Sequence, residues 1–180
     1  MDENGVQLAC FEIGAEKFAF NMEYLVEIVQ VRQTKITPYC SPVPIIRGQW
    51  DYRGASVYLI DVREFFGLKE RESFSEANNE SEEDVTTQEP VAKNILVVKI
   101  QEHIFGLLTD AVLQMQSLSE LYEYPTMVST LPRRYFAGVT IINAELVLLL
   151  AIEEFINTHE LDILFGRTSE VDERRASLIH

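Results

Sequence analysis

Residues 45–60 are IIRGQWDYRGASVYLI, and residues 135–150, which lie 90 positions later, are YFAGVTIINAELVLLL. Each stretch contains two apolar runs around a short turn, at Arg53 and Gly54 in the first and at Asn143 and Ala144 in the second. Gly adopts the positive φ of tight hairpin turns at no steric cost, and Asn is the next best residue. Both stretches are therefore predicted to be β-hairpins.

The two hairpins belong to a weak internal repeat. With an offset of 90, identical residues align: Gly48 with Gly138, Val57 with Val147, Leu59 with Leu149, Glu64 with Glu154 and Phe65 with Phe155. With an offset of 87, apolar residues align: Leu8, Phe11, Ile13, Phe18 and Leu25 with Ile95, Val98, Ile100, Phe105 and Val112. The repeat predicts two equivalent halves, about 8–66 and 95–156, each ending in a short helix. Short strands with close turns favour small barrels or a sandwich.

The charge of the chain excludes several classes of partner. Its 180 residues include 29 acidic and 15 basic side chains, which gives a net charge of −14. Nucleic acid and anionic lipid bind mainly to basic surfaces, so neither is an expected partner. The longest apolar run, residues 146–152, is far shorter than the roughly 20 residues of a spanning helix, and the first residues lack a signal-peptide pattern. We expect a cytoplasmic protein without direct membrane insertion.

Two segments flank or interrupt the repeat. Residues 70–89 hold eight acids and one base, so we expect a flexible acidic loop over 70–92. Two interpretations stay open, a solvated linker and a docking arm for a basic partner. Residues 158–180 are expected to be a helical tail, because Leu161, Leu164 and Phe165 have helical spacing. That apolar face is predicted to pack on a barrel, and binding a partner is the alternative.

The sequence contains no convincing catalytic, cofactor or metal site. Cys10 and Cys40 form no CxxC motif, and Cys10 lies in an apolar run where a buried, unreactive thiol is expected. No G-x-S-x-G elbow or phosphate-binding glycine motif is present. Asp61 and Asp110 are a conceivable carboxylate pair, but Asp61 is placed to cap the helix that follows it. We therefore expect a protein that is not an enzyme.

Several motifs together resemble the CheW family of chemotaxis coupling proteins. Residues 46–54 are IRGQWDYRG and precede Val57, Leu59 and Asp61, where the family has roughly G-x-x-N-L-R-G-x-x-x-P-V-x-D-L. Residues 106–112, GLLTDAV, are similar to the family's G-L-L-V-D-x-V. Phe18 with residues 26–28, and the closing strands at 135–150, agree as well. The resemblance covers about residues 7–157.

The resemblance implies a mainly β fold of two intertwined five-stranded barrels with short helices over a shared apolar core. It implies no catalysis and no cofactor. Family members are adaptors that connect the cytoplasmic tips of chemoreceptors, the methyl-accepting proteins, to the regulatory domain of the histidine kinase CheA. The receptor tip lies in the groove between the barrels. The resemblance thus implies a cytoplasmic scaffold that is recruited to membrane-associated receptor arrays.

By position, four residues match places where the family contacts receptor or kinase: Leu25, Glu27, Gly48 and Arg53. Leu25 also suits the core, and Gly48 also suits tight backbone geometry. Glu27 is expected to point outward between two core residues, Val26 and Ile28. The guanidinium of Arg53 is suited to bridging carboxylates or carbonyls of a partner helix.

Trp50 is added to this predicted partner-binding set because Trp and Tyr are enriched in interface hot spots. Residues 48, 50 and 52 share one face of a strand. Trp50 and Tyr52 extend the binding patch if that face looks outward, and they fill the barrel if it looks inward. The sequence leaves both possibilities open.

Four residues depart from the family pattern: Asp51 for Asn, Tyr52 for Leu, Tyr58 for Pro and Ala151 for a frequent Asp. Asp51 is expected to form an ion pair with Arg53. The departures favour a divergent family member that serves a particular receptor class. Two alternative functions stay open, an adaptor of a surface-motility or developmental pathway, and a barrel that binds a small ligand between its halves or hydrolyses it.

Overall fold

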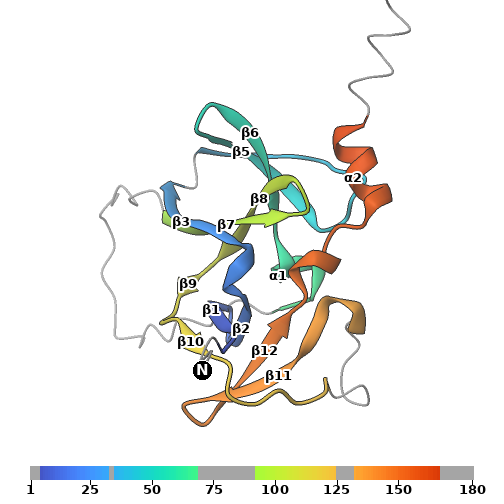
Figure 1. The fold of residues 1–180 in the computed structure, drawn as a ribbon. Helices are drawn as coiled ribbons and strands as arrows, with labels where there is room; N and C mark the ends of the chain where they lie inside the picture. The colour runs from blue at the N-terminus through green and yellow to red at the C-terminus, as the bar shows by residue number, and fades with distance from the viewer. Residues whose placement is uncertain (1–4, 33–34, 69–91, 125–131, 167–180) are drawn as a thin grey trace, which may run out of the picture.

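The computed structural model describes residues 5–32, 35–68, 92–124 and 132–166. They form two antiparallel-rich sheets of six strands each, which occupy the lower and upper parts of Figure 1. Sheet A has the order β10-β1-β2-β12-β11, with β9 also pairing β1. Its strands are β1 (Gln7–Ile13), β2 (Glu16–Asn21), β9 (Ala111–Val112), β10 (Gln116–Ser117), β11 (Phe136–Ile142) and β12 (Glu145–Leu150).

Sheet B has the order β3-β7-β8-β6-β5-β4. Its strands are β3 (Leu25–Arg32), β4 (Ile36–Pro38), β5 (Ile46–Tyr52), β6 (Ala55–Ile60), β7 (Ala92–Ile100) and β8 (His103–Thr109). Short helical turns connect or follow the strands: η1 (Met22–Tyr24), α1 (Val62–Phe65), η3 (Arg133–Tyr135), η4 (Ile152–Glu154) and α2 (Thr158–Phe165).

The two halves of the chain exchange hairpins. The hairpin β1–β2 of the first half joins sheet A, and β7–β8 of the second half joins sheet B. The joining contacts are the two parallel strand pairs, in which Phe18 is opposite Leu148 and Phe105 is opposite Tyr58. Phe18 and Phe105 are 87 residues apart, and Tyr58 and Leu148 are 90 apart, so the two pairs are the same contact in the two repeats. This exchange confirms the intertwined, mainly β fold. Each sheet has six strands instead of the expected five, because short strands are included.

The repeat also extends to backbone details. The pairing register shifts between Ile46 and Gly48 in sheet B and between Phe136 and Gly138 in sheet A. Both hairpin turns have positive φ at two residues, 55° and 84° at Arg53 and Gly54, and 53° and 62° at Asn143 and Ala144. Two successive positive φ angles are the geometry of a two-residue hairpin loop whose twist matches its strands. The predicted turn positions are therefore confirmed.

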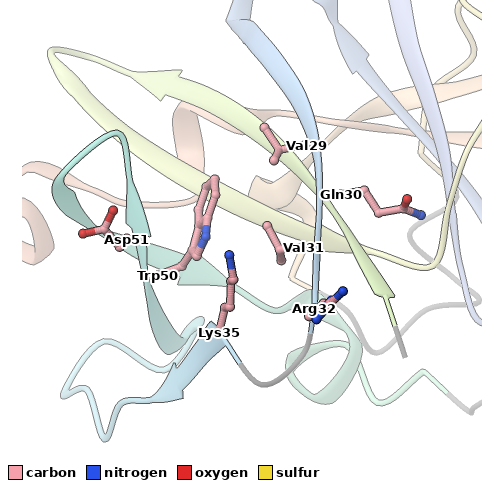
Figure 2. A pocket seen from close by; sticks show the side chains of 7 residues that line it. All are labelled: Val29, Gln30, Val31, Arg32, Lys35, Trp50 and Asp51. Atoms are coloured by element: carbon pink, nitrogen blue, oxygen red, sulfur yellow. The ribbon is translucent and has the colours of Figure 1, made fainter. Parts of the chain in front are cut away.

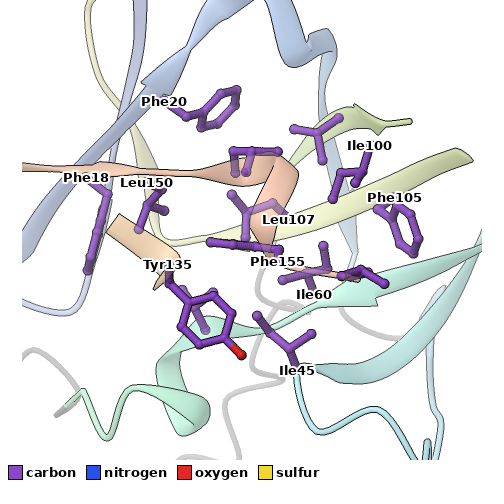
Figure 3. Close-up of a cluster of buried hydrophobic side chains, with 14 of the residues drawn as sticks. Phe18, Phe20, Ile45, Ile60, Ile100, Phe105, Leu107, Tyr135, Leu150 and Phe155 are labelled. Carbon is purple, nitrogen blue, oxygen red and sulfur yellow. The ribbon is translucent and has the colours of Figure 1, made fainter. Parts of the chain in front are cut away.

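The shared core lies between the sheets and is almost entirely apolar. The Phe11 ring of sheet A contacts the rings of Phe18 and Phe20, with centroids 5.8 Å apart in each pair. Figure 3 shows the ten labelled members of this cluster: Phe18, Phe20, Ile45, Ile60, Ile100, Phe105, Leu107, Tyr135, Leu150 and Phe155. Apolar side chains fill most of the seam between the sheets, and a pocket of about 220 Å³ at its margin is lined by Ile13 of sheet A together with Asp61, Arg63, Lys93 and Asp110. The alternative of a ligand bound between the halves therefore keeps only this small site.

The helix α2 packs on sheet B. Asn157 and Glu160 form a reciprocal capping box with two 2.9 Å hydrogen bonds, which fixes the first turn. Leu161 and Leu164 are buried, and the Phe165 ring stacks on His103 with centroids 4.0 Å apart. This packing agrees with the helical spacing of the apolar residues. The rest of the predicted tail, residues 167–180, lies outside the described residues.

Tyr58, one of the four departures from the family pattern, has a structural role. Its hydroxyl donates a 3.2 Å hydrogen bond to the carbonyl of Leu164, and its ring contacts Tyr39 and Phe165. Burial raises the pKa of Tyr58 above its ordinary value, and Tyr39 adds to the effect. The side chain therefore ties α2 to β6. Of the predicted acidic loop, residues 70–91 lie outside the described residues and Ala92 begins β7.

Candidate partner-binding surfaces

Strand β3 turns out to have the opposite orientation to the expected one. Val26 and Ile28 were expected in the core but are 51% and 42% exposed, whereas Glu27 is half-buried on the inner side with Val29 and Val31. The expectation was wrong because β3 carries apolar residues on both faces, so alternation alone does not choose between them. A register shift between Leu25 and Glu27 also interrupts the pairing with β7.

The inward orientation of Glu27 brings three side chains together, which we name the Glu27 cluster: Glu27, Tyr52 and Arg53. One oxygen of Glu27, Oε2, accepts hydrogen bonds from the Tyr52 hydroxyl at 2.5 Å and from Nη2 of Arg53 at 2.7 Å. The Arg53 guanidinium lies 5.1 Å from the centroid of the Tyr52 ring. Strand β3 and the β5–β6 turn thus hold a cation, an anion and a phenol in one small surface feature.

The expected partner of Arg53 was different. Asp51 was expected to form an ion pair with Arg53, but its carboxylate accepts the backbone N–H of Gly54 at 3.1 Å. That bond lies within the hairpin loop and satisfies a turn amide, as Asp side chains often do. The expectation was wrong because Asp51 points to the outer face of β5, whereas Glu27 reaches Arg53 from β3, an edge strand that is not paired with β5.

The Glu27 cluster is suited to recognition more than to stability. The Arg53 side chain is 72% exposed and that of Glu27 is 36% exposed, and such surface pairs contribute about 0–1 kcal/mol. The hydrogen bond to Glu27 raises the pKa of Tyr52 above its ordinary value, because ionisation would place two negative charges together. A guanidinium has five N–H donors, so Arg53 keeps donors for a partner while Glu27 holds it.

The structure places the aromatic pair on the inner face of β5. Trp50 is only 7% exposed and packs inside sheet B with Val31, Leu59, Ile95 and Val97. Its ring centroid is 5.2 Å from that of Tyr52, which is half-buried. Of the two possibilities left open, the filled barrel is correct for Trp50, and an outward-facing Trp50 is not.

Gly48 and Leu25 are not part of the Glu27 cluster. A Cβ on Gly48 would lie 3.2 Å from the carbonyl oxygen of Thr37 and 3.3 Å from Cγ2 of Ile36, so the close neighbour is strand β4. Leu25 is half-buried and packs partly against the shared core. Among the five predicted partner-binding residues, Glu27 and Arg53 are therefore brought together, Trp50 lies behind them, and Gly48 and Leu25 lie apart.

Sequence reasoning missed a second exposed feature, on sheet A. Ile141 and Leu146 are directly opposite each other on β11 and β12 and are 53% and 58% exposed. Their counterparts in sheet B, at an offset of 90, are Asp51 and Ser56, which are also opposite each other. The repeat itself contained the signal, because apolar residues occupy positions that are polar in the equivalent hairpin. We name Ile141 and Leu146 the apolar pair.

The two aspartates considered as a catalytic pair have structural roles. Asp61 caps α1 and accepts the Arg63 backbone N–H at 2.9 Å, as expected. Asp110 accepts the buried Gly14 N–H at 2.7 Å and the guanidinium of Arg63. Burial raises the pKa of Asp110, but the Gly14 N–H and the Arg63 guanidinium outweigh it, so the pKa lies below its ordinary value. Asp110 thus links the β1–β2 turn of sheet A to α1 beside sheet B.

Cys10 and Cys40 are free thiols, and burial raises the pKa of Cys10, which fits the expected unreactive thiol. Within residues 5–32, 35–68, 92–124 and 132–166, no group of three or more His, Cys, Asp or Glu is placed to hold a metal ion. In those same ranges, the helices are too short or too polar to cross a bilayer.

Comparisons with known proteins agree with this geometry. The family model described as "CheW-like domain" matches residues 7–160. The chain is 22% identical over 167 residues to "Chemotaxis protein CheW" of Rhizobium meliloti, an alignment that covers 89% of this chain and 93% of that protein. It is 23% identical over 163 residues to "Probable chemotaxis protein CheW" of Rhizobium etli, with the same shares covered.

A solved structure shows the same fold. The crystal structure of scaffolding protein TtCheW from Thermoanaerobacter tengcongensis aligns with a TM-score of 0.64 at 19% identity, covering 87% of this chain and 90% of that chain. The family match spans far more than half of the sequence. The structure also has the intertwined arrangement that the resemblance implied, because the two halves exchange hairpins. The chain therefore belongs to the CheW-like family, whose members are non-enzymatic scaffolds.

Proposed function

We propose that this scaffold couples the cytoplasmic tips of chemoreceptors to the regulatory domain of a CheA-like histidine kinase. It holds both partners at once and catalyses no reaction, so its output is control of the kinase. In this role it works in the cytoplasm and is recruited to membrane-associated receptor arrays. Membership in the CheW-like family supports the proposal, as do two curated relatives that are named chemotaxis proteins.

One observation carries the proposal: the equivalent hairpins of the two sheets present different surface chemistry, although at different positions along the hairpin. The β5–β6 hairpin of sheet B holds the charged Glu27 cluster, and the β11–β12 hairpin of sheet A holds the apolar pair. Charged surfaces set specificity and orientation, whereas exposed apolar side chains supply contact energy when they are buried. A protein that holds two different partners needs two such different surfaces, and a duplicated fold provides them on one rigid body.

The test is a capture assay with two immobilised partners, a receptor tip and a kinase regulatory domain. Two variants probe the two surfaces: Arg53→Ala, and Ile141→Asp with Leu146→Asp. Each variant is expected to weaken capture of one partner by about tenfold, or about 1.4 kcal/mol, and to leave capture of the other intact. Arg133→Ala, an exposed cation elsewhere on the chain, is the matched control.

Circular dichroism of each variant shows whether the fold survives, since the changed side chains are exposed. Capture of neither partner by the folded parent chain would contradict the proposal. Variants that weaken both partners equally would contradict the division of labour between the two sheets.

A second candidate is an adaptor of a different pathway, for surface motility or development. The observation that favours it is Tyr52, which replaces the usual Leu of the family and donates directly to Glu27. A changed side chain inside the Glu27 cluster changes the hydrogen-bonding pattern that a partner meets. Identification of the receptors that copurify from the native cell distinguishes the two pathways.

A further inference from the structure

A cleft of about 860 Å³ opens beside the free edge of β3 in sheet B (Figure 2). In the described part of the chain, β3 pairs with β7 alone, so one row of its backbone N–H and C=O groups faces this cleft. A row of unpaired backbone groups is a template for one more strand. The volume lies within the range of roughly 300–1,000 Å³ that is typical of ligand sites.

Three apolar side chains, two cations, one amide and one carboxylate line the cleft in the described part of the chain. Figure 2 shows Val29 and Val31 pointing from β3 toward Trp50, and Lys35 reaching into the space between Val31 and Trp50. The alternate residues of β3, including Arg32, point to the other side of the strand. A strand added to β3 would therefore meet an apolar face on its inner side and cations at one end.

The charge of the rim differs from that of the whole chain. Arg32 and Lys35 are both exposed, and neither takes part in the ion pairs found among the described residues. Among the described lining residues, Asp51 is the one carboxylate; it accepts the Gly54 N–H and keeps its negative charge, so that with Arg32 and Lys35 the described lining has a net charge of +1. Two cations beside an apolar wall, on a chain with a net charge of −14, favour an acidic ligand.

At the equivalent place in sheet A, Gln116 and Ile142, the counterparts of Val29 and Tyr52, line a smaller hollow of about 220 Å³. Residues 120–122 of sheet A correspond to β4 of sheet B, because Tyr122 is paired with Val139 as Thr37 is paired with Gln49. The cleft of sheet B is therefore the wider of the two.

We propose that the cleft binds an extended acidic peptide segment of a partner protein, which adds as a strand to the free edge of β3. Its backbone pairs with β3, its apolar side chains contact Val29 and the exposed edges of Val31 and Trp50, and its carboxylates meet Arg32 on the outer side of the strand and Lys35 at the end of the cleft. Addition of a strand to a sheet edge is a recurrent mode of peptide recognition. This site uses neither Glu27 nor Arg53 and goes beyond the proposed coupling function.

Trp50 makes the proposal directly measurable, because it is the only Trp of the chain. The probe is the peptide N-acetyl-(Val-Glu)3-amide, titrated into the full chain while Trp fluorescence is recorded. An extended chain of this sequence has Val on one face and Glu on the other. A saturable change in Trp50 emission that weakens as salt is added is expected.

Charge reversal tests the cationic rim. The double variant Arg32→Glu, Lys35→Glu is expected to bind the peptide at least about tenfold more weakly than the parent chain. The matched control, Lys99→Glu with Arg133→Glu, makes the same change in net charge at exposed positions outside the cleft, and it is expected to bind as the parent chain does.

Three results would overturn the proposal. The first is equal binding of the peptide with N-methylated backbone amides, because such a peptide cannot pair with β3. The second is equal binding of N-acetyl-(Val-Lys)3-amide. The third is binding that appears only after residues 70–89 are replaced by a neutral linker, because the acidic segment of the chain itself would then be the occupant.

Discussion

The hairpins β5–β6 and β11–β12 have the same register shift, the same two-residue loop and the same kind of parallel neighbour, yet their outer side chains differ. Asp51 and Ser56 are opposite each other in β5–β6, and they correspond to Ile141 and Leu146 in β11–β12. The exchange of hairpins needs the backbone geometry, so both halves keep it. The surface is under no such requirement, so the two sheets can present different chemistry to different partners.

The barrel ends next to these hairpins differ in the same way. Glu27, Tyr52 and Arg53 contact one another in sheet B. Their counterparts in sheet A are Gln114, Ile142 and Asn143, which line a hollow of about 220 Å³. The three residues of a charged, hydrogen-bonded cluster in one repeat thus correspond to three uncharged residues of a partly open site in the other, which Lys17 and Glu145 also line. The difference indicates that the Glu27 cluster is not needed to close a barrel of this kind.

The helical turns after the hairpins show what one side chain changes. Asp61 caps α1 through the Arg63 N–H, whereas its counterpart Ala151 gives no side-chain cap and the turn that follows, η4, is a 3-10 turn. An Asp at this position satisfies an otherwise unpaired amide of the first turn. The same backbone path is therefore completed by a hydrogen bond in one half and by packing in the other.

The largest expected effect tests how tightly the two hairpins are packed. A Cβ on Gly138 would lie 2.6 Å from the backbone oxygen of Tyr122, whereas the closest approach at Gly48 is 3.2 Å. Gly138→Ala is therefore expected to lower the free energy of unfolding by about 3 kcal/mol and Gly48→Ala by about 1 kcal/mol, in urea denaturation. Equal losses would show that the two repeats are packed alike at this position.

The next largest loss of stability is expected on removal of a contact that only one repeat makes. Asp110→Ala leaves the buried Gly14 N–H without its acceptor, which is expected to cost about 2 kcal/mol. The equivalent residue of the first repeat, Glu23, accepts a hydrogen bond from the Asn21 side chain at the surface. Glu23→Ala, the matched control, is expected to change stability by no more than about 0.5 kcal/mol.

The Asp110 contact also makes stability depend on pH. The pKa of Asp110 is lowered in the folded protein, so its contribution is complete above the unfolded pKa, about 4, and is lost as pH falls through the lower folded value. The difference in unfolding free energy between the parent chain and Asp110→Ala is expected to shrink on acidification below about pH 4. A difference that stays constant in denaturation curves down to pH 2 would contradict this.

Apart from the control, the variant with the smallest expected effect on stability, Glu27→Gln, makes sheet B resemble sheet A at one position. Glu27→Gln places in sheet B the residue that sheet A has as Gln114, and it is expected to lower the pKa of Tyr52 toward the ordinary value near 10. Since the pKa of Tyr52 is raised, its hydrogen bond stabilises the fold below about pH 10 and is lost as pH rises through the folded pKa.

NMR titration of 13C-labelled Tyr measures the change in the pKa of Tyr52. Stability at pH 7 is expected to change by no more than about 1 kcal/mol, because the pair is at the surface. An unchanged pKa of Tyr52 in Glu27→Gln would show that Glu27 is not the cause of the shift.

Much of the architecture could be predicted from local patterns. The turns at Arg53 and Asn143, the cap at Asp61 and the apolar spacing of Leu161 and Leu164 all agree with the structure. These features depend on residues close together in the chain, whose conformational preferences act over one turn or one hairpin. The repeat adds the equivalence of the halves, since the same local signals recur in the same order.

The candidate site was predicted less well. The face of β3 was wrong, the partner of Arg53 was wrong, and the orientation of Trp50 was left open. Each depends on which strand lies beside β3 or β5, and β3 carries apolar residues at Leu25, Val26 and Ile28, on both of its faces. A pattern with two apolar faces has no preferred side until a neighbouring sheet buries one of them.

The sequence by itself determined that this chain is a duplicated β protein with tight hairpin turns, no catalytic motif and an acidic character, because composition, turn residues and repeat spacing are properties of the chain alone. Only the tertiary structure decided that the halves exchange hairpins, that Glu27 reaches Tyr52 and Arg53, and that a cleft opens beside β3. The physical reason is that side chains dozens of residues apart meet only when strand order and register bring them together, and burial across the whole fold selects that order.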